Sequence, residues 1–335
     1  MGIKKFLLAA LSCVAALTVP LSACTESSGL IFTEVYDGIM DHTLNGYSVS
    51  GTLSPDEDGV YKIPGTYRGE KVLDVSYVEL LGDGEKLVIE YGPTVIGRTA
   101  FGGDDDYKDF SANTAAKLTS VALPSSLEVL GRGVFCGGSM QNITLPQGLK
   151  SIGSLAFAYS SLNTVFIPDS VTEIDSMAFY RSQLTSAFVF GGEALHDAFL
   201  SCKQLEYVYL GENVKILDYA FYGCTALKTV VMRGVEEISV ENFYNCTSLE
   251  SITIPSTAEL VSEEAFQGCD SLKEVIFEQQ EEWYLCEWVR YPDEYNVISA
   301  ADFSDSAHNA ELLSQRDDIT QPLVYRHIPD YIGGE

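Results

Sequence analysis

Four cysteines recur at nearly constant spacing, which makes them the first candidates for chemistry. Each follows a phenylalanine by three residues, and the four are Cys202, Cys224, Cys246 and Cys269. Adjacent strands lie about 4.8 Å apart, a Cα separation that permits a disulfide. However, stacked side chains point the same way, and a line of thiols is not the tetrahedron that zinc prefers. Gly138, Ser160 and Ser182 likewise follow earlier phenylalanines by three residues. We therefore predict a column of small side chains, in which the cysteines are buried free thiols. Cys136 and Cys286 fall outside this column.

The other reactive side chains form no known catalytic motif. The four histidines are far apart in the sequence, at His42, His196, His308 and His327. No metalloprotease, nucleophile-elbow, P-loop or C-x-x-C motif accompanies them. The run Asp104, Asp105, Asp106 with Asp109 offers oxygen ligands for calcium but lacks the spacing of a known calcium loop, so a solvated loop is the alternative. We therefore expect no enzyme, no catalytic residue, no cofactor and no metal site.

The charge of the chain excludes one class of partner. The chain has 335 residues, with 20 Lys+Arg against 48 Asp+Glu, and its formal net charge is −28. Such a surface repels phosphate groups, which argues against binding to nucleic acids. A solvated acidic surface explains the composition most simply, and basic or divalent-cation partners stay open as alternatives. A hydrophobic content of 46% is enough for a sizeable core.

The first 24 residues have the pattern of an export signal that ends before a cysteine. Lys4 and Lys5 precede an apolar run over residues 6–19, and the segment ends in Leu21-Ser22-Ala23-Cys24. This ending resembles the lipobox of bacterial lipoproteins. The resemblance implies removal of residues 1–23, lipidation of Cys24, a short tether over residues 24–29, and anchoring to the outside of the bacterial cell membrane or outer membrane. An ordinary secretory signal is the alternative.

A repeat of about 22 residues organises most of the chain. Large apolar residues open successive units at intervals of 21 to 23 residues, at Leu118, Met140, Leu162, Leu184, Leu205, Leu227, Leu249 and Leu272. A second series of the same period is Phe135, Phe157, Phe179, Phe199, Phe221, Phe243 and Phe266, preceded by Phe101 before a polar insertion near residues 102–117. A fixed period of this length is the signature of a solenoid, in which each unit supplies the core of the next.

Each unit predicts one short strand followed by turns. In the unit from Leu162, alternation at Val165 and Ile167 predicts a strand with one face buried, and Pro168 ends that strand. Val171 and Ile174 return the chain to the core, and Phe179 packs beneath the strand. Two units depart from the pattern: Asn242 replaces the usual alanine before Phe243, and Phe190 replaces the proline.

This pattern resembles the BspA-like (Treponema-type) leucine-rich repeats, whose consensus is close to LxxVxIPxSVxxIGxxAFxxCxxL. The resemblance covers residues 85–277 and implies a β-rich leucine-rich-repeat solenoid with a parallel sheet of short strands and caps at both ends. Residues 30–84 are similar to the lead-in of such proteins, at Tyr47 to Gly51 and in VYKIPGTYRGEKV (60–72). Residues 278–335, with Trp283 and Trp288, look like their closing cap.

Aromatic residues occupy outward positions of the central strands. Outer units have mostly small or polar residues there, whereas the middle units have Phe166, Phe188, Phe190, Tyr207 and Tyr209. Contiguous exposed rings are typical of surfaces that bind sugars or peptide side chains. Simple β-propensity is the alternative, and Phe190 could turn inward because its unit is one residue short. A second set, Tyr180, Tyr222 and Tyr244, is predicted to pack along an edge.

The sequence thus predicts a binding protein. The family resemblance implies adhesion or interaction at the cell surface, with an extracellular protein or glycan ligand from a host or neighbouring cell. The aromatic residues above are the predicted ligand site, and the lipid on Cys24 the predicted membrane contact. The alternative is a structural envelope or surface-assembly lipoprotein without an exogenous ligand.

Overall fold

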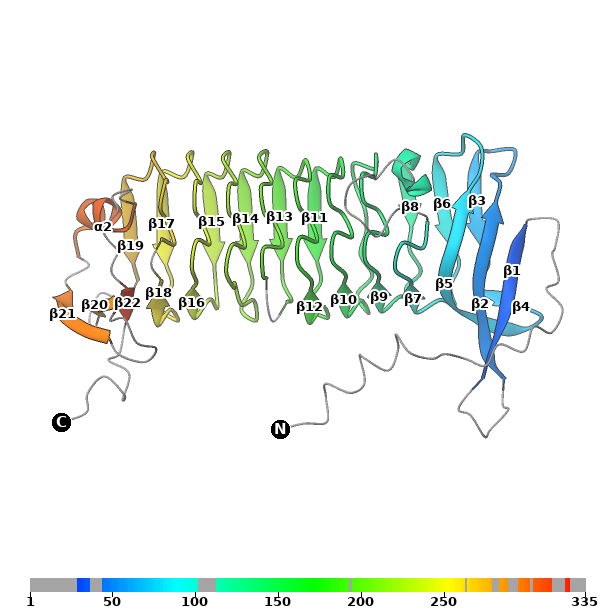
Figure 1. Ribbon diagram of the computed structural model, residues 1–335, viewed down its shortest axis with the longest axis horizontal. Coiled ribbons are helices and arrows are strands. Elements are labelled where there is room, and N and C mark those ends of the chain that lie inside the picture. Colours follow the sequence, from blue (N-terminus) through cyan, green and yellow to red (C-terminus); the bar gives the residue numbers. More distant parts are fainter. Residues whose placement is uncertain are drawn as a thin grey trace.

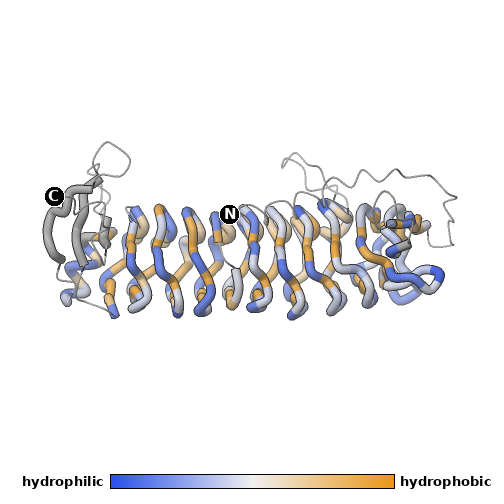
Figure 2. The backbone as a smooth tube through the Cα atoms, turned by 90° about the horizontal axis from the view of Figure 1, so that it is seen from below, coloured by the Kyte–Doolittle hydropathy of each residue, from blue (hydrophilic) through white to orange (hydrophobic). Residues whose placement is uncertain are grey.

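Each unit of the repeat forms one coil, and the coils stack so that equivalent residues lie above one another (Figure 1). The computed structural model describes residues 29–36, 44–101, 113–192, 195–262, 264–278, 283–288, 295–301, 304–314 and 323–325. The predicted signal, the predicted lipidation site Cys24 and the acidic run at Asp104 lie outside these residues. The predicted solenoid of short parallel strands is confirmed. Apolar segments recur in coil after coil along the stack (Figure 2).

One side of the stack, the strand face, is formed by the strands of the L-x-x-V-x-I segments. These strands are β3 (Val60–Ile63), β6 (Lys86–Ile89), β8 (Ser120–Ala122), β11 (Thr164–Ile167), β13 (Ser186–Val189), β14 (Tyr207–Leu210), β15 (Thr229–Met232), β17 (Ser251–Ile254) and β19 (Glu274–Phe277). The prediction of one strand per unit is wrong for the unit from Met140, because residues 141–146 form no strand. Pairing is parallel within three groups, β3-β6-β8, β11-β13-β14-β15 and β17-β19. In β11, Val165 and Ile167 are buried while Phe166 is exposed, as the alternation predicts.

A second ladder runs behind the strand face and joins both ends of the stack. Its members are β7 (Val95–Ile96), β9 (Val129–Leu130), β10 (Ser151–Ile152), β12 (Glu173–Ile174), β16 (Glu237–Ile238) and β18 (Leu260–Val261). Single bridges at Leu195 and Ile216 connect β12 to β16. Ile174 of β12 is 3% exposed, which confirms that this part of the unit returns to the core.

The third side, the turn edge, consists of tight turns around the repeated phenylalanines. In the coil of Phe221 the backbone is left-handed two residues before the ring, at Tyr219 (φ 62°), and two residues after it, at Gly223 (φ 69°). This geometry directs alternate N–H groups toward the next coil: Phe221 donates to the Asn242 carbonyl at 2.9 Å. Most described coils share it, although Tyr219 and Glu241 are residues that rarely adopt positive φ.

The phenylalanines form a continuous stack along the interior. Its eight members are each 0% exposed, and they are Phe101, Phe135, Phe157, Phe179, Phe199, Phe221, Phe243 and Phe266. Successive ring centroids are 5.0 Å apart at Phe179–Phe199 and 5.8 Å apart at Phe101–Phe135. The rings of Phe243 and Phe266 are almost parallel, with an interplanar angle of 2°. This phenylalanine column confirms the series that the sequence defined.

The cysteines form the predicted column of free thiols beside these rings. Cys202, Cys224, Cys246 and Cys269 are free and buried. Each thiol donates to the carbonyl of a phenylalanine in an earlier coil, for example Cys202 Sγ to Phe179 O at 3.0 Å. Burial raises the pKa of Cys202 to about 12, so the thiol stays protonated at neutral pH. Cys136 is also free and buried, and lies against Leu155 and Ala158.

Both departures from the repeat find a structural explanation. Asn242 is fully buried, and its side chain accepts a hydrogen bond from the N–H of Ala220 (3.3 Å) and donates to the carbonyl of Ser239 (3.0 Å). Phe190 has the backbone donor that proline lacks, and it donates to the carbonyl of Ile167 at 3.0 Å. Its ring is 41% exposed, so the alternative that Phe190 turns inward is wrong.

Additional strands lie at the two ends of the coil stack. At the N-terminal end β1 (Leu30–Tyr36) pairs antiparallel with β2 (Leu44–Leu53), β2 pairs with β5 (Glu70–Leu80), and β5 pairs with β7 and with β4 (Thr66–Tyr67). At the other end β22 (Leu323–Tyr325) pairs antiparallel with β18 and with β20 (Trp283–Trp288), which also pairs with β21 (Tyr295–Ala301). Antiparallel strands thereby end the parallel ladder at both sides.

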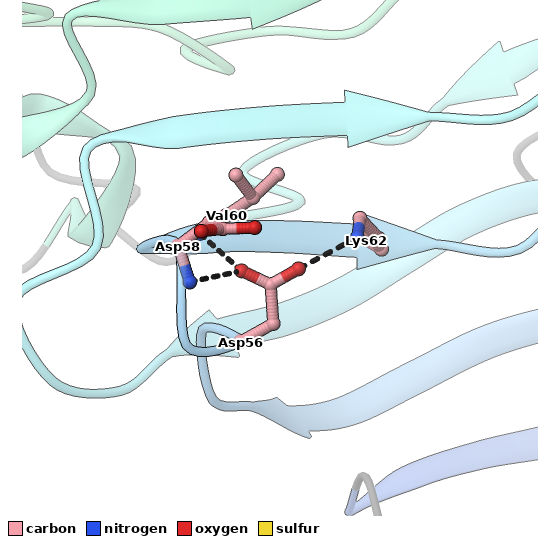
Figure 3. A network of polar contacts seen from close by, with 4 residues as sticks. All are labelled: Asp56, Asp58, Val60 and Lys62. Carbon is pink, nitrogen blue, oxygen red and sulfur yellow. Dashed lines mark hydrogen bonds and ion pairs between the residues drawn. The ribbon is translucent and has the colours of Figure 1, made fainter.

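Polar side chains hold the turn before β3 at one end of the stack and helix α2 at the other. The carboxylate of Asp56 accepts hydrogen bonds from the N–H groups of Asp58 and Val60, both at 3.0 Å, and from Lys62 Nζ at 2.6 Å (Figure 3). These contacts, the one with Lys62 first, hold the pKa of Asp56 below its usual value and fix the turn that enters β3. At the other end, Asn309 of helix α2 (Ser306–Ser314) donates to the carbonyl of Val275 in β19 at 2.9 Å. A short 3-10 helix (Thr114–Lys117) precedes β8.

Candidate binding face

Three neighbouring strands bring the predicted aromatic residues together. The register of β11 and β13 pairs Phe166 with Phe188, and the register of β13 and β14 pairs Phe188 with Tyr209. Tyr207 precedes Tyr209 by two residues on β14 and therefore faces the same side. The structure thus places all five predicted residues, including Phe190, on one surface, which we call the aromatic patch.

The rings of the aromatic patch contact one another along the stack. Phe166 and Phe188 are stacked, with centroids 4.7 Å apart and an interplanar angle of 9°. Phe188 then meets Tyr207 at 5.5 Å, and Phe190 meets Tyr209 at 5.5 Å, both in tilted geometry. Such pairs stabilise each other by about 0.5–1.5 kcal/mol beyond area burial. Cross-strand packing therefore explains part of the pattern, as the β-propensity alternative requires.

A large apolar area nevertheless stays exposed. Phe166 is 57% exposed although a fully apolar side chain gains nothing from water, while Phe188, Tyr207 and Tyr209 are half-buried. The aromatic character is confined to the centre: the next outward residues are Thr144 on one side and Val231 on the other. A contiguous, exposed aromatic patch with non-aromatic borders is typical of a recognition surface.

Charged side chains border the strand face directly before β14, β15, β17 and β19. Lys228 Nζ lies 3.0 Å from Glu206 Oε2, and Lys273 Nζ lies 2.9 Å from Glu250 Oε2, each pair linking adjacent coils. These ions are satisfied by one another and are not arranged around a reacting atom. The face offers contact area and ring stacking rather than acid–base chemistry.

The two histidines that the structure describes, His196 and His308, are both exposed. His196 is exposed, with Nδ1 3.5 Å from Asp197 Oδ1. Asp197 has a structural role, because its carboxylate accepts hydrogen bonds from Ser176 Oγ at 3.0 Å and from the N–H of Met177 at 2.9 Å. His308 is exposed on α2, and His42 and His327 lie outside the described residues. Within the described ranges, His, Cys, Asp and Glu side chains nowhere gather in groups of three or more that could hold a metal.

A second group of aromatic residues lies on the turn edge, and the sequence revealed only part of it. Tyr222 and Tyr244 stack at 4.8 Å, which confirms the predicted edge packing. Sequence reasoning missed Tyr159 and Tyr219, which are 38% and 37% exposed and occupy left-handed positions two residues from a column phenylalanine. Counting positions from each phenylalanine would have found them.

The repeats assign the chain to a family. The family described as "BspA type Leucine rich repeat region" matches residues 105–214 and 193–284 in six copies. These ranges together span more than half of the chain, and the protein therefore belongs to the BspA-type leucine-rich repeat family. A comparison with curated proteins found no match. Within the described part of the chain, no helix has the length and apolar character needed to cross a membrane.

Several solved structures are similar to this chain. A leucine-rich repeat protein from Bacteroides ovatus ATCC 8483 is 22% identical, with a TM-score of 0.42, over 76% of this chain and 88% of that one. A leucine-rich repeat protein from T. pallidum is 20% identical, with a TM-score of 0.43, over 67% and 90%. A leucine-rich cell surface protein from Faecalibacterium prausnitzii A2-165 is 19% identical, with a TM-score of 0.37, over 76% and 88%.

Proposed function

We propose that this protein is a lipid-anchored surface protein that binds extracellular protein or glycan ligands through the aromatic patch. The proposal depends on one observation: five aromatic rings contact one another on or directly beside three hydrogen-bonded strands, and Phe166 and Phe190 among them are 57% and 41% exposed. The five are Phe166, Phe188, Phe190, Tyr207 and Tyr209. Membership of a repeat family whose coils present one continuous surface supports a role in recognition.

The rigidity of the strands favours binding. Phe188 stands on β13, which pairs with β11 and β14, and Tyr207 and Tyr209 stand on β14, which pairs with β13 and β15. Phe166 stands on β11, which pairs with β13. Neighbouring rings restrict one another further, so little conformational entropy is lost when a ligand covers them. Aromatic rings accept both the C–H faces of sugars and apolar peptide side chains, which is why both ligand classes remain in the proposal.

The test is an array of glycans and extracellular-matrix proteins probed with the full-length chain. We expect the triple variant Phe166→Ala, Phe188→Ala and Tyr209→Ala to lose binding. The control variant Ser120→Ala, Ser251→Ala and Thr253→Ala changes exposed positions of β8 and β17, which do not pair with the strands of the patch, and it should bind normally. Both variants should keep the wild-type circular dichroism spectrum.

The outcomes separate the proposal from its alternative. Normal binding by the triple aromatic variant would reject the patch as the ligand site. Concentration-dependent self-association with no ligand on the array would instead favour a structural role in the envelope. Anchoring is tested separately: Cys24 is the proposed lipidated residue, and Cys24→Ala should abolish incorporation of a labelled fatty acid.

A further inference from the structure

A second surface, with partly exposed side chains, lies on the turn edge, away from the strand face. It combines three tyrosines with carboxylates from three consecutive coils, and we call it the acidic tyrosine strip. Its members are Asp218, Tyr219, Tyr222, Glu241, Tyr244 and Glu264. Tyr219, Glu241 and Glu264 occupy the same position in successive coils, two residues before a column phenylalanine, and all three have positive φ.

The three tyrosine rings form one continuous group. Tyr222 and Tyr244 stack face to face, with centroids 4.8 Å apart and an interplanar angle of 6°. Tyr219 lies 6.1 Å from Tyr222 and is 37% exposed. The same backbone turn that buries Phe221 therefore displays aromatic rings on either side of it.

Nearby carboxylates act on the ring of Tyr219. Glu241 is the main cause of the raised pKa of Tyr219, and Asp218 and Glu264 contribute to it. Burial raises the pKa of Glu241 itself, and the charge of Glu264, a side-chain hydrogen bond with Glu264 and the charge of Asp218 raise it further. The strip thus holds mutually repelling carboxylates, and a positive charge placed among them would relieve that repulsion.

The turn edge already shows how a cation can be accommodated. Two coils before Tyr222, at the equivalent position, the guanidinium of Arg181 lies over the ring of Tyr180 with its carbon 5.1 Å from the centroid. By contrast, the segments 217–223, 239–245 and 262–268 contain no lysine or arginine. These segments therefore supply carboxylates but no cation of their own to the tyrosine rings, whereas Arg181 supplies one to Tyr180.

We propose that the acidic tyrosine strip binds an arginine-containing basic segment of a partner protein. The guanidinium is planar, stacks on aromatic rings and pairs with carboxylates, so it uses both features of the strip at once. A lysine-rich segment would use the carboxylates but stack less well. This surface is independent of the aromatic patch, which carries no cluster of acidic side chains within its rings.

The test measures calorimetric binding of the full-length chain to a short peptide of alternating arginine and glycine. Replacing arginine with lysine should weaken binding. Tyr222→Leu with Tyr244→Leu should weaken it roughly five-fold or more, because two cation–π contacts are lost. Tyr222→Phe with Tyr244→Phe keeps the rings and should retain affinity, which separates the role of the rings from any effect on folding.

The carboxylates are tested with a charge-matched control. Glu241→Gln with Glu264→Gln should reduce affinity and its dependence on salt. Glu259→Gln with Glu274→Gln removes the same charge from exposed residues outside the turn edge and should leave affinity within about two-fold of wild type. Absence of binding, equal losses in the two glutamine variants, or full affinity in the leucine variant would each overturn the proposal.

Discussion

The phenylalanine column should carry a large share of the stability of the solenoid, and Phe221→Ala tests this at its centre. Phe221 is 0% exposed and stacks on Phe199 at 5.4 Å and on Phe243 at 5.5 Å. Truncating a buried phenylalanine costs about 3–5 kcal/mol, because the transfer free energy is lost and a cavity remains. Phe166→Ala removes the same atoms from a residue that is 57% exposed, and losing its contact with the Phe188 ring should cost about 0.5–1.5 kcal/mol.

Urea and thermal unfolding of the full-length chain measure the difference. Because each coil contacts only its neighbours, a cavity at Phe221 should also weaken the coupling between the coils before it and the coils after it. The unfolding transition should therefore become broader. Phe221→Leu keeps most of the apolar volume and should fall between the alanine variant and wild type. Equal destabilisation by Phe221→Ala and Phe166→Ala would refute the argument that stacked coils share one core.

Three further predictions follow from buried or crowded groups. Asn242→Ala restores the residue usual in this repeat, yet it removes the acceptor of the Ala220 N–H, so we expect a loss of about 1–3 kcal/mol in urea unfolding; unchanged or higher stability would contradict this. Burial raises the pKa of Cys202 to about 12 and that of Cys224 and Cys246 well above its usual value, so these thiols should resist Ellman's reagent in the native protein and react in urea. Rapid native labelling of these positions would be inconsistent with the buried column. Burial and neighbouring carboxylates raise the pKa of Glu241, so its contribution to stability is present at acid pH and is lost as the pH rises through the folded-state pKa. Glu241→Gln should therefore raise the melting temperature at neutral pH but not near pH 4, the lower end of the carboxylate range; a stabilisation of equal size at both pH values would disprove this cause.

Much of the molecule could be predicted from periodicity. The spacing of Phe157, Phe179 and Phe199 defined the interior column, and the outward positions of Phe166, Phe188 and Tyr209 defined a shared surface. These predictions succeeded because stacking equivalent coils places equivalent positions above one another. Any property that depends only on position within the unit, such as burial of a ring or a thiol, is then fixed by the repeat itself.

The features that periodicity missed depend on contacts between different coils. Tyr219 and Glu241 adopt left-handed backbone conformations because the turn must direct hydrogen bonds to the following coil, not because of their residue types. Asn242 departs from the alanine of the repeat pattern, and only the structure shows that its side chain accepts a hydrogen bond from Ala220 in the preceding coil. The sequence alone determined the solenoid, its interior columns and its strand face, since these follow from local alternation and period. Only the tertiary structure decided the turn edge and its acidic tyrosine strip, because the energy that holds those turns comes from neighbouring coils.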